Sequence, residues 1–379
     1  MDAYRRAWDE NRKRADSHLF WPHEPYRDDR SILVAGCGTK QAAHYAVRWP
    51  RARIVGIDVS ETSIAFEREL KREHGLHNLE LHPLPIERAA ELGQEFDQVV
   101  CTGVLHHLAD PDAGLGALRD VLASDGAMHL MVYAPYGRAG IYMLQEYCRR
   151  LNVGWGDGEI GDLVASLKAL PAEHPLVPPL RNSPDFATRA GVADALLHPR
   201  DRSYSVPQLI EFVERAGMVF ERWIRQAQYL PDCGAIATTP HAALLAKLPV
   251  RDQYAAMELF RGTMTRHAFI CRRAGRPQPD APSFAGNEWL EYVPLRLPDT
   301  IAVRERLPPG AVAVLINRNH IYTDLYMPVD ACEERMWCAI DGVRTVGEIG
   351  ATVGDHAAQI FFRNLWLWDQ IVVDTSRCH

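Results

Sequence analysis

The chain has 379 residues, enough for one large domain or two ordinary domains with full cores. Apolar residues make up 47% and charged residues 24%, as in soluble globular proteins, and no apolar run reaches the roughly 18 residues of a membrane-spanning helix. The net charge of −7 disfavours a general nucleic-acid binder, because such proteins usually carry a basic surface.

The first 30 residues are predicted to form an N-terminal helical cap. A helix is expected from about Ala3 to His18, followed by a loop rich in aromatic residues and proline. This charged segment lacks the apolar core of a signal peptide, so we expect a cytoplasmic protein. The eight cysteines form no CxxC pair, which argues against a zinc site or a disulfide framework, and we predict no metal.

From residue 31 the sequence alternates between short apolar runs and amphipathic segments. This rhythm is typical of an α/β protein whose parallel sheet is covered on both faces. The predicted strands are residues 32–35, 53–57, 79–82, 96–101 and 127–133, with a turn at 124–126. The predicted helices are residues 40–48, 60–74 and 111–122, with a short helix before the fourth strand.

A glycine turn follows the first predicted strand. Gly36 and Gly38 flank Cys37, and a helix begins directly after them. Glycines at such a turn let a ligand approach the backbone closely, and the helix that follows offers its positive end. Asp58 follows Gly36 by 22 residues, a spacing that places a carboxylate at the tip of the neighbouring strand, within reach of ribose hydroxyls. The stretch therefore predicts a site for a nucleoside-bearing cofactor.

The rhythm breaks after the fifth strand and then resumes. Residues 136–204 read as a helical insertion over the sheet, with helices at about 137–151, 158–170 and 185–197 and a proline-rich loop at 171–184. A helix at 206–216, a strand within 218–226, a helix at about 240–262 and a last strand at 267–272 follow. We therefore predict a Rossmann-like, seven-stranded mixed sheet in a domain of residues 31–274.

Residues 275–379 are predicted to form a linker and a smaller α+β domain. Three helices and a closing strand give it a winged-helix-like pattern, and its last helix is apolar and aromatic rather than basic. Packing on the core is one interpretation of that helix. Docking of a peptide or protein, or homodimerisation, is the other.

Four motifs in order resemble the class I S-adenosyl-L-methionine-dependent methyltransferases, of the type 11/12-like group. They are ILVAGCGT (32–39), IDVS (57–60), FDQVVCTGVLHHL (96–108) and LASDGA (122–127). The resemblance implies S-adenosyl-L-methionine as cofactor and S-adenosyl-L-homocysteine as product. A nicotinamide-binding domain would want GxGxxG, whereas position 41 is Gln41. The motifs of amino-methylating and cytosine-5 DNA methyltransferases are missing, so we expect no nucleic-acid substrate.

The resemblance also implies which residues hold the cofactor. They are Gly36, Cys37, Gly38, Thr39, Lys40, Asp58, Val59, Pro85, Ile86, Thr102, Gly103 and His106. Three features depart from the family pattern: Ala35 replaces an acid, Lys40 replaces a third glycine, and no acid follows the third strand. The Lys40 ammonium either meets the cofactor carboxylate or lies on the helix surface.

Methyl transfer needs proximity and alignment more than a catalytic triad. The candidate catalytic residues are His106, Tyr133 and Tyr136, with His106 as a general base or a hydrogen-bond partner of the substrate. The candidate substrate-binding residues are Arg138, Tyr142, Glu146, Arg200, Arg202 and Tyr204. The alternatives are that the first three pack the insertion onto the core and that an Arg–Asp network around 200–202 braces it.

Three functions remain open at this point. The first is transfer of a methyl group to O, N or S of a small organic metabolite, without a nucleic-acid or membrane partner. The second is methylation of a protein or peptide that docks on the C-terminal domain. The third is a protein that binds S-adenosyl-L-methionine without catalysis, suggested by Ala35, Lys40 and the missing acid after the third strand.

Overall fold

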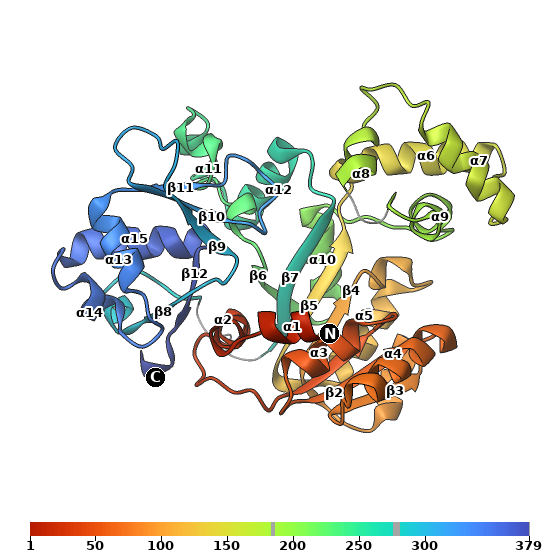
Figure 1. Ribbon diagram of the computed structural model, residues 1–379, viewed down its shortest axis with the longest axis horizontal. Helices are drawn as coiled ribbons and strands as arrows, with labels where there is room; N and C mark the ends of the chain where they lie inside the picture. Colours follow the sequence, from red (N-terminus) through yellow and green to blue (C-terminus); the bar gives the residue numbers. More distant parts are fainter. Residues whose placement is uncertain (183–185, 276–280, 379) are drawn as a thin grey trace.

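A seven-stranded sheet forms the centre of the protein (Figure 1). The computed structural model describes residues 1–182, 186–275 and 281–378. The sheet order is β3-β2-β1-β4-β5-β7-β6, and β7 runs antiparallel to both of its neighbours. The strands are β1 (Ser31–Ala35), β2 (Arg53–Asp58), β3 (Leu79–Pro83), β4 (Phe96–Thr102), β5 (Leu122–Tyr133), β6 (Met218–Trp223) and β7 (Arg266–Arg273). The predicted mixed sheet is confirmed, and the predicted turn at 124–126 is instead part of β5.

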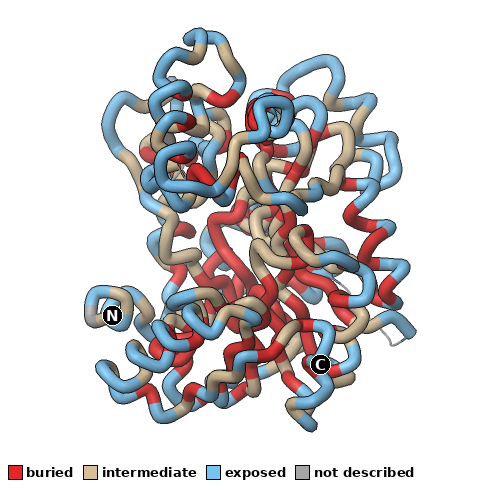
Figure 2. Tube along the Cα trace, turned by 90° about the vertical axis from the view of Figure 1, so that its right-hand side faces the viewer, coloured by how far each residue is buried: buried red, intermediate tan, exposed pale blue. Residues whose placement is uncertain are grey.

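Helices cover both faces of this sheet and bury its apolar side chains, as the red central segments of Figure 2 show. One core holds Leu33, Val99 and Leu130 with residues of α5 and α10, and the opposite core holds Val34 and Ile54 with residues of α3. The helices are α3 (Gln41–Arg48), α4 (Glu61–His74), α5 (Pro111–Asp120), α10 (Val206–Arg215), α11 (Ala242–Leu245) and α12 (Val250–Arg261). Short 3-10 turns are η1 (Ile86–Leu92), η2 (Leu105–His107), η3 (Tyr136–Arg138), η5 (Ala227–Tyr229) and η6 (Ala235–Thr238).

The N-terminal cap contains two helices where the sequence predicted one. These are α1 (Asp2–Ala7) and α2 (Glu10–Phe20). The break occurs because Asp9 caps α2, and its carboxylate accepts a hydrogen bond of 2.9 Å from the Arg12 N–H. The predicted helix at 240–262 is likewise divided, since Pro249 precedes α12 and starts a new helix.

The insertion after β5 forms a separate helical layer at the upper right of Figure 1. Its helices are α6 (Ala139–Arg150), α7 (Asp157–Leu167), α8 (Val177–Asn182) and α9 (Arg189–Leu197). They share a small core that includes Ile141, Leu163 and Leu196. The helix α8 lies in the predicted proline-rich loop, and the predicted helix start near 185 lies outside the described residues, which resume at 186.

The C-terminal unit has the three predicted helices and closing strand, and four strands that the sequence analysis missed. Its elements are η7 (Glu288–Glu291), β8 (Val293–Arg296), β9 (Thr300–Val303), β10 (Ala313–Asn317), β11 (Met327–Val329), α13 (Ala331–Ala339), α14 (Val346–Gly350), α15 (Asp355–Leu367), β12 (Ile371–Asp374) and η8 (Ser376–Cys378). One small sheet pairs β12 with β8, and the other has the order β11-β10-β9. Part of the predicted linker, residues 276–280, lies outside the described residues.

The C-terminal unit shares a core with the N-terminal cap and the main sheet. Phe20 of α2 packs in one apolar cluster with Ile270 of β7 and with Leu295 and Val372 of the small β12–β8 sheet. The Thr375 N–H donates a hydrogen bond of 2.7 Å to the Pro22 carbonyl. The unit is therefore joined to the domain through buried side chains. Among the described helices, none combines the length and apolarity that crossing a membrane would need.

Candidate cofactor and substrate site

The glycine turn lies at the carboxyl end of β1, where open parallel sheets bind ligands. Gly36 and Gly38 both have positive φ angles, +68° and +58°. A Cβ on Gly36 would lie 2.4 Å from the Val104 side chain, whereas a Cβ on Gly38 would meet no atom within 4 Å. Gly36 is thus required by internal packing, and Gly38 faces the open space in which a cofactor would lie.

Most backbone donors of the turn are already used. The N–H groups of Gly36 and Cys37 both donate to the Ile57 carbonyl, at 2.8 and 3.0 Å. The Cys37 side chain is buried, so this predicted cofactor residue forms the wall of the turn. Within the described parts of the chain, the N–H groups of Thr39 and Lys40 have no hydrogen-bond partner, and they are the donors left for a ligand.

Asp58 stabilises the turn from the end of β2. Its Oδ2 accepts a hydrogen bond of 2.9 Å from the Gly38 N–H, and its Oδ1 accepts one of 2.8 Å from the Ser60 N–H. The residue is half-buried, and each carboxylate oxygen keeps a further acceptor site. The carboxylate can therefore accept ribose hydroxyls while it holds the turn in place.

A buried glutamate occupies the N-terminus of α3. The two carboxylate oxygens of Glu67 each accept a hydrogen bond of 2.9 Å, from the N–H groups of Ala42 and Ala43. These are donors that a helix N-terminus would otherwise offer to an anion. The exposed side chain of Lys40, which directly precedes the helix, is then the cationic group at this end of the site. Nothing in the sequence pattern pointed to Glu67.

We expect Glu67 to make stability depend on pH. Burial raises the pKa of Glu67 to about 7, so the folded protein holds a proton that the unfolded chain releases above its ordinary pKa of 4.5. This contribution is present at low pH and is lost as the pH rises through about 7. Between pH 5 and 8, the free energy of unfolding of the wild type should fall by about 2 kcal/mol more than that of Glu67→Gln. Urea unfolding at both pH values measures this, and parallel curves would contradict it.

The residues predicted to meet the adenine lie beside the end of β2. Val59 is 71% exposed, which is unusual for valine and leaves an apolar surface next to Asp58. Pro85 is half-buried and Ile86 is buried in the main core. The Leu84 N–H donates a hydrogen bond of 3.0 Å to the Asp58 carbonyl, which fixes this loop against the strand. Val59 and Pro85 thus offer an apolar surface without an acid to a base.

Thr102 and Gly103 form the opposite wall at the end of β4. The Gln41 amide of α3 donates a hydrogen bond of 2.8 Å to Thr102 Oγ1, which joins the two walls. Gly103 has a φ of +80°, and its N–H donates to the carbonyl of Met131 on β5. In the sequence, Gln41 stands out only because it replaces a glycine of the nicotinamide-binding pattern. The hydrogen bond by which Gln41 joins the two walls depends on the tertiary fold.

His106 is fully buried beside Tyr133. The two rings lie 3.9 Å apart between centroids, and neither ring nitrogen of His106 has a hydrogen-bond partner among the described residues. Burial, followed by the charges of His107 and Arg138, lowers the pKa of His106 to about 2. A neutral ring without solvent contact is poorly suited to act as a general base, so this geometry favours a structural role for His106, in which its ring packs against Tyr133.

Arg138 is directed into the protein rather than toward a ligand. Its Nη2 lies 2.9 Å from Asp201 Oδ2, and the two side chains are only 5% and 2% exposed. The guanidinium also lies 3.5 Å from the centre of the Tyr133 ring, and its Nε donates a hydrogen bond of 3.3 Å to the Tyr142 hydroxyl. Arg138 and Tyr142 therefore anchor the insertion to the end of β5. This is the alternative in which these residues pack the insertion onto the core.

The segment around Arg200 and Arg202 also braces the site. The Arg200 carbonyl lies 2.7 Å from His107 Nδ1, and Arg202 Nη2 donates to the Ala109 carbonyl at 3.1 Å. The Tyr204 N–H donates to the Tyr133 carbonyl at 2.9 Å. These contacts tie the segment along the ends of β4 and β5. The Arg202 side chain takes part in them, whereas Arg200 contributes only backbone groups and its side chain is exposed.

Two further predicted residues lie at the surface of the insertion. Glu146 forms ion pairs with Arg149 and Arg150 on the exposed side of α6. It is therefore not grouped with the other predicted substrate residues. Tyr136, in η3, is 43% exposed and remains open to a ligand.

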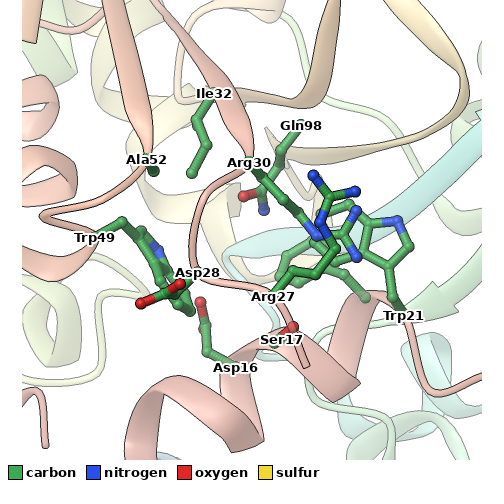
Figure 3. A pocket seen from close by; sticks show the side chains of 11 residues that line it. Asp16, Ser17, Trp21, Arg27, Asp28, Arg30, Ile32, Trp49, Ala52 and Gln98 are labelled. Atoms are coloured by element: carbon green, nitrogen blue, oxygen red, sulfur yellow. The ribbon is translucent and has the colours of Figure 1, made fainter. Parts of the chain in front are cut away.

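A separate pocket lies at the amino ends of β1 and β4, away from the glycine turn (Figure 3). Arg30 lies there with its guanidinium 3.6 Å from the centre of the Trp21 ring and 2.7 Å from Glu24. The lining residues are Asp16, Ser17, Phe20, Trp21, Arg27, Asp28, Arg30, Ile32, Trp49, Ala52 and Gln98. This pocket is lined by residues of α2 and is not part of the cofactor site.

Over the described residues, no group of His, Cys, Asp or Glu side chains is arranged to hold a metal ion.

Comparison with known proteins gives a family match in the first half of the chain. Residues 33–128 match a family described as "Methyltransferase domain". An uncharacterised protein of Synechococcus sp. is 32% identical over 257 residues, which cover 66% of this chain and 61% of that protein. The malonyl-[acyl-carrier protein] O-methyltransferase of Acetivibrio thermocellus is 31% identical over 120 residues, covering 31% of this chain and 41% of the enzyme. The chain thus spans less than two thirds of the length of both relatives.

Solved structures of a rickettsial protein resemble nearly the whole chain. PKMT2 from Rickettsia typhi, in complex with AdoHcy, superposes with a TM-score of 0.65 over 97% of this chain and 75% of that one. The sequence identity is 15%, so the likeness concerns the fold. It includes the C-terminal unit, because the match extends far beyond residues 33–128.

Proposed function

Because the chain carries a class I S-adenosyl-L-methionine-dependent methyltransferase domain, we propose that it transfers a methyl group to O, N or S of a small organic metabolite. The observation that carries the proposal is the cradle formed by Gly38, Asp58 and the exposed Val59 at the carboxyl edge of the sheet. It provides open space, a carboxylate for the ribose and an apolar surface for a base.

The chain contributes binding and alignment to this reaction. When bound, S-adenosyl-L-methionine supplies an electrophilic methyl group for an in-line displacement. Asp58 would orient the ribose, and the N–H groups of Thr39 and Lys40 with the Lys40 ammonium would hold the carboxylate end. The walls formed by Thr102, Gly103 and the Tyr133 region would restrict the direction from which an acceptor approaches.

The alternative function, methylation of a protein or peptide, requires that the C-terminal unit serve as a docking module. The unit has an apolar core of its own, which includes Phe284, Trp337 and Phe361. In addition, Leu295 and Val372 are buried together with Phe20 of the N-terminal cap, so the unit is not a detachable module. This shared core supports a structural role for the unit. A small-molecule acceptor is therefore the simpler proposal.

Two glycine variants test the cofactor site. Gly38→Ala and Gly93→Ala each place a Cβ in open space at a positive φ, +58° and +64°. Both should lose about 1 kcal/mol of stability from backbone strain. Only Gly38→Ala should weaken S-adenosyl-L-homocysteine binding, by at least about 10-fold, because its Cβ enters the cofactor space.

Isothermal titration calorimetry on the wild type and both variants measures these affinities. Absence of S-adenosyl-L-homocysteine binding by the folded wild type would contradict the proposed function. Equal affinities of the two variants would remove Gly38 from the site. Tight cofactor binding without methyl transfer to any acceptor would instead favour a non-catalytic binding protein.

A further inference from the structure

We propose that Arg225 and Arg266 form a recognition site for an anionic group, a carboxylate or a phosphate, on the methyl acceptor. The inference rests on the proposed function, because it assigns a substrate class to the same edge of the sheet. It concerns two residues that the family resemblance did not indicate.

The strand register places Arg266 at the acceptor side of the site. In the antiparallel pair of β5 and β7, Arg266 lies directly opposite Tyr133, the residue that contacts both His106 and Arg138. Directly opposite residues of such a pair point to the same face of the sheet, with Cβ atoms about 5 Å apart. Arg266 is exposed, and the neighbouring Met131 and Ala268 are half-buried, so this part of the sheet is not covered completely.

Arg225 approaches the same place from β6. This strand ends at Trp223, and the Ile224 N–H still donates to the Ala268 carbonyl of β7, so Arg225 follows at the same edge of the sheet. Because Ile224 pairs with Ala268, the backbone of Arg225 lies beside the first residues of β7, which begins at Arg266. In Figure 1 the ends of β5, β6 and β7 lie between the C-terminal unit and the insertion.

Neither guanidinium has an ion pair or hydrogen bond with a side chain in the part of the chain that the structure describes. The acids whose charges reach Arg225 are Asp299 and Asp369. Asp299 is already bound to Arg12 at 2.9 Å and to the Asn319 amide at 2.7 Å. Asp369 accepts hydrogen bonds from the Ala227 N–H and His320 Nε2, at 2.9 and 3.1 Å.

The environment of Arg225 favours a bound anion. Burial, followed by the charge of Arg266, lowers the pKa of Arg225. The Arg225 guanidinium is partly removed from water beside an exposed second cation, and the nearby acids are engaged elsewhere. A ligand that carries negative charge would stabilise this arrangement. Planar guanidinium groups suit the paired oxygens of a carboxylate or phosphate. Arg138, which also contacts Tyr133, is different, since it is paired with Asp201 and buried.

The test measures binding of inorganic phosphate and of acetate to protein saturated with S-adenosyl-L-homocysteine. Calorimetric titrations use the wild type, Arg225→Gln, Arg266→Gln and, as control, Arg68→Gln, which removes an exposed arginine on α4. We expect saturable binding of at least one anion to the wild type and at least a 10-fold weaker affinity in each of the two site variants. Arg68→Gln should stay within twofold, and Arg266→Lys should lose less than Arg266→Gln.

The outcomes separate this inference from the proposed function. Tight S-adenosyl-L-homocysteine binding by the wild type without saturable anion binding would overturn the anion site alone, as would unchanged anion affinity in Arg266→Gln. That exposed variant decides the question even if Arg225→Gln does not fold. Preference for phosphate over acetate, or the reverse, would support the site and distinguish the two kinds of acceptor.

Discussion

Replacing Asp58 with asparagine will weaken S-adenosyl-L-homocysteine binding by at least about 100-fold. The change removes the charge that strengthens hydrogen bonds to two ribose hydroxyls, and such bonds contribute about 1.5–3 kcal/mol each. An asparagine also cannot accept from both the Gly38 and Ser60 N–H groups, which the carboxylate now holds at 2.9 and 2.8 Å. The affinity is measured by calorimetry, with thermal unfolding recorded for the same samples.

Asp97→Asn is the matched control for this variant. Asp97 also accepts hydrogen bonds from a backbone N–H and a hydroxyl, both of Ser31, at 2.6 and 3.0 Å, but it lies at the amino end of the strands. Its replacement should lower stability and leave the affinity for S-adenosyl-L-homocysteine within about twofold. Equal affinities for wild type and Asp58→Asn would show that this carboxylate is not a ribose ligand.

Truncation of Asp201 to alanine will lower the free energy of unfolding by about 3–5 kcal/mol. The variant leaves the Arg138 guanidinium, which is 5% exposed, without its carboxylate partner in a buried position. It also removes an acceptor of the Gln145 amide at 2.8 Å. Urea unfolding followed by circular dichroism measures the loss, and limited proteolysis reports whether the insertion is released first.

A surface ion pair and a double variant calibrate this result. Asp112→Ala breaks an ion pair of 2.9 Å with Arg215, in which both side chains are at least half exposed, and should cost less than about 1 kcal/mol. Arg138→Met combined with Asp201→Leu should recover much of the stability that Asp201→Ala loses, since no charge is then left buried. A loss no larger than that of Asp112→Ala would mean that Arg138 finds another partner or reaches water.

Much of the cofactor side of the site was predictable because its signals are local. The turn at Gly36 and Gly38 and the carboxylate at the end of the second strand follow from strand–turn–helix patterns within 30 residues. The structure adds Gln41 and Glu67, which contact these elements from other parts of the fold. Their side chains have no local signature, since glutamine and glutamate are ordinary residues in helices.

The acceptor side was less predictable because its residues are charged and come from distant segments. A sequence pattern does not distinguish an arginine that binds a ligand from one that is paired within the protein. Arg138 and Arg202 were expected to face a substrate and are bound to Asp201 and to the Ala109 carbonyl. Arg225 and Arg266 carried no signal and remain without an acidic partner among the described residues.

The sequence by itself determined the seven strands of the mixed sheet and the cradle of Gly38 and Asp58, because hydrophobic periodicity and turn chemistry act over short distances. Only the tertiary structure decided which buried charges are neutralised within the protein. Arg138 and Asp201 are 63 residues apart, and they meet because the insertion folds back onto the end of β5. The C-terminal unit likewise has its own core, and only the fold shows that Leu295 and Val372 are also buried against the N-terminal cap and the main sheet.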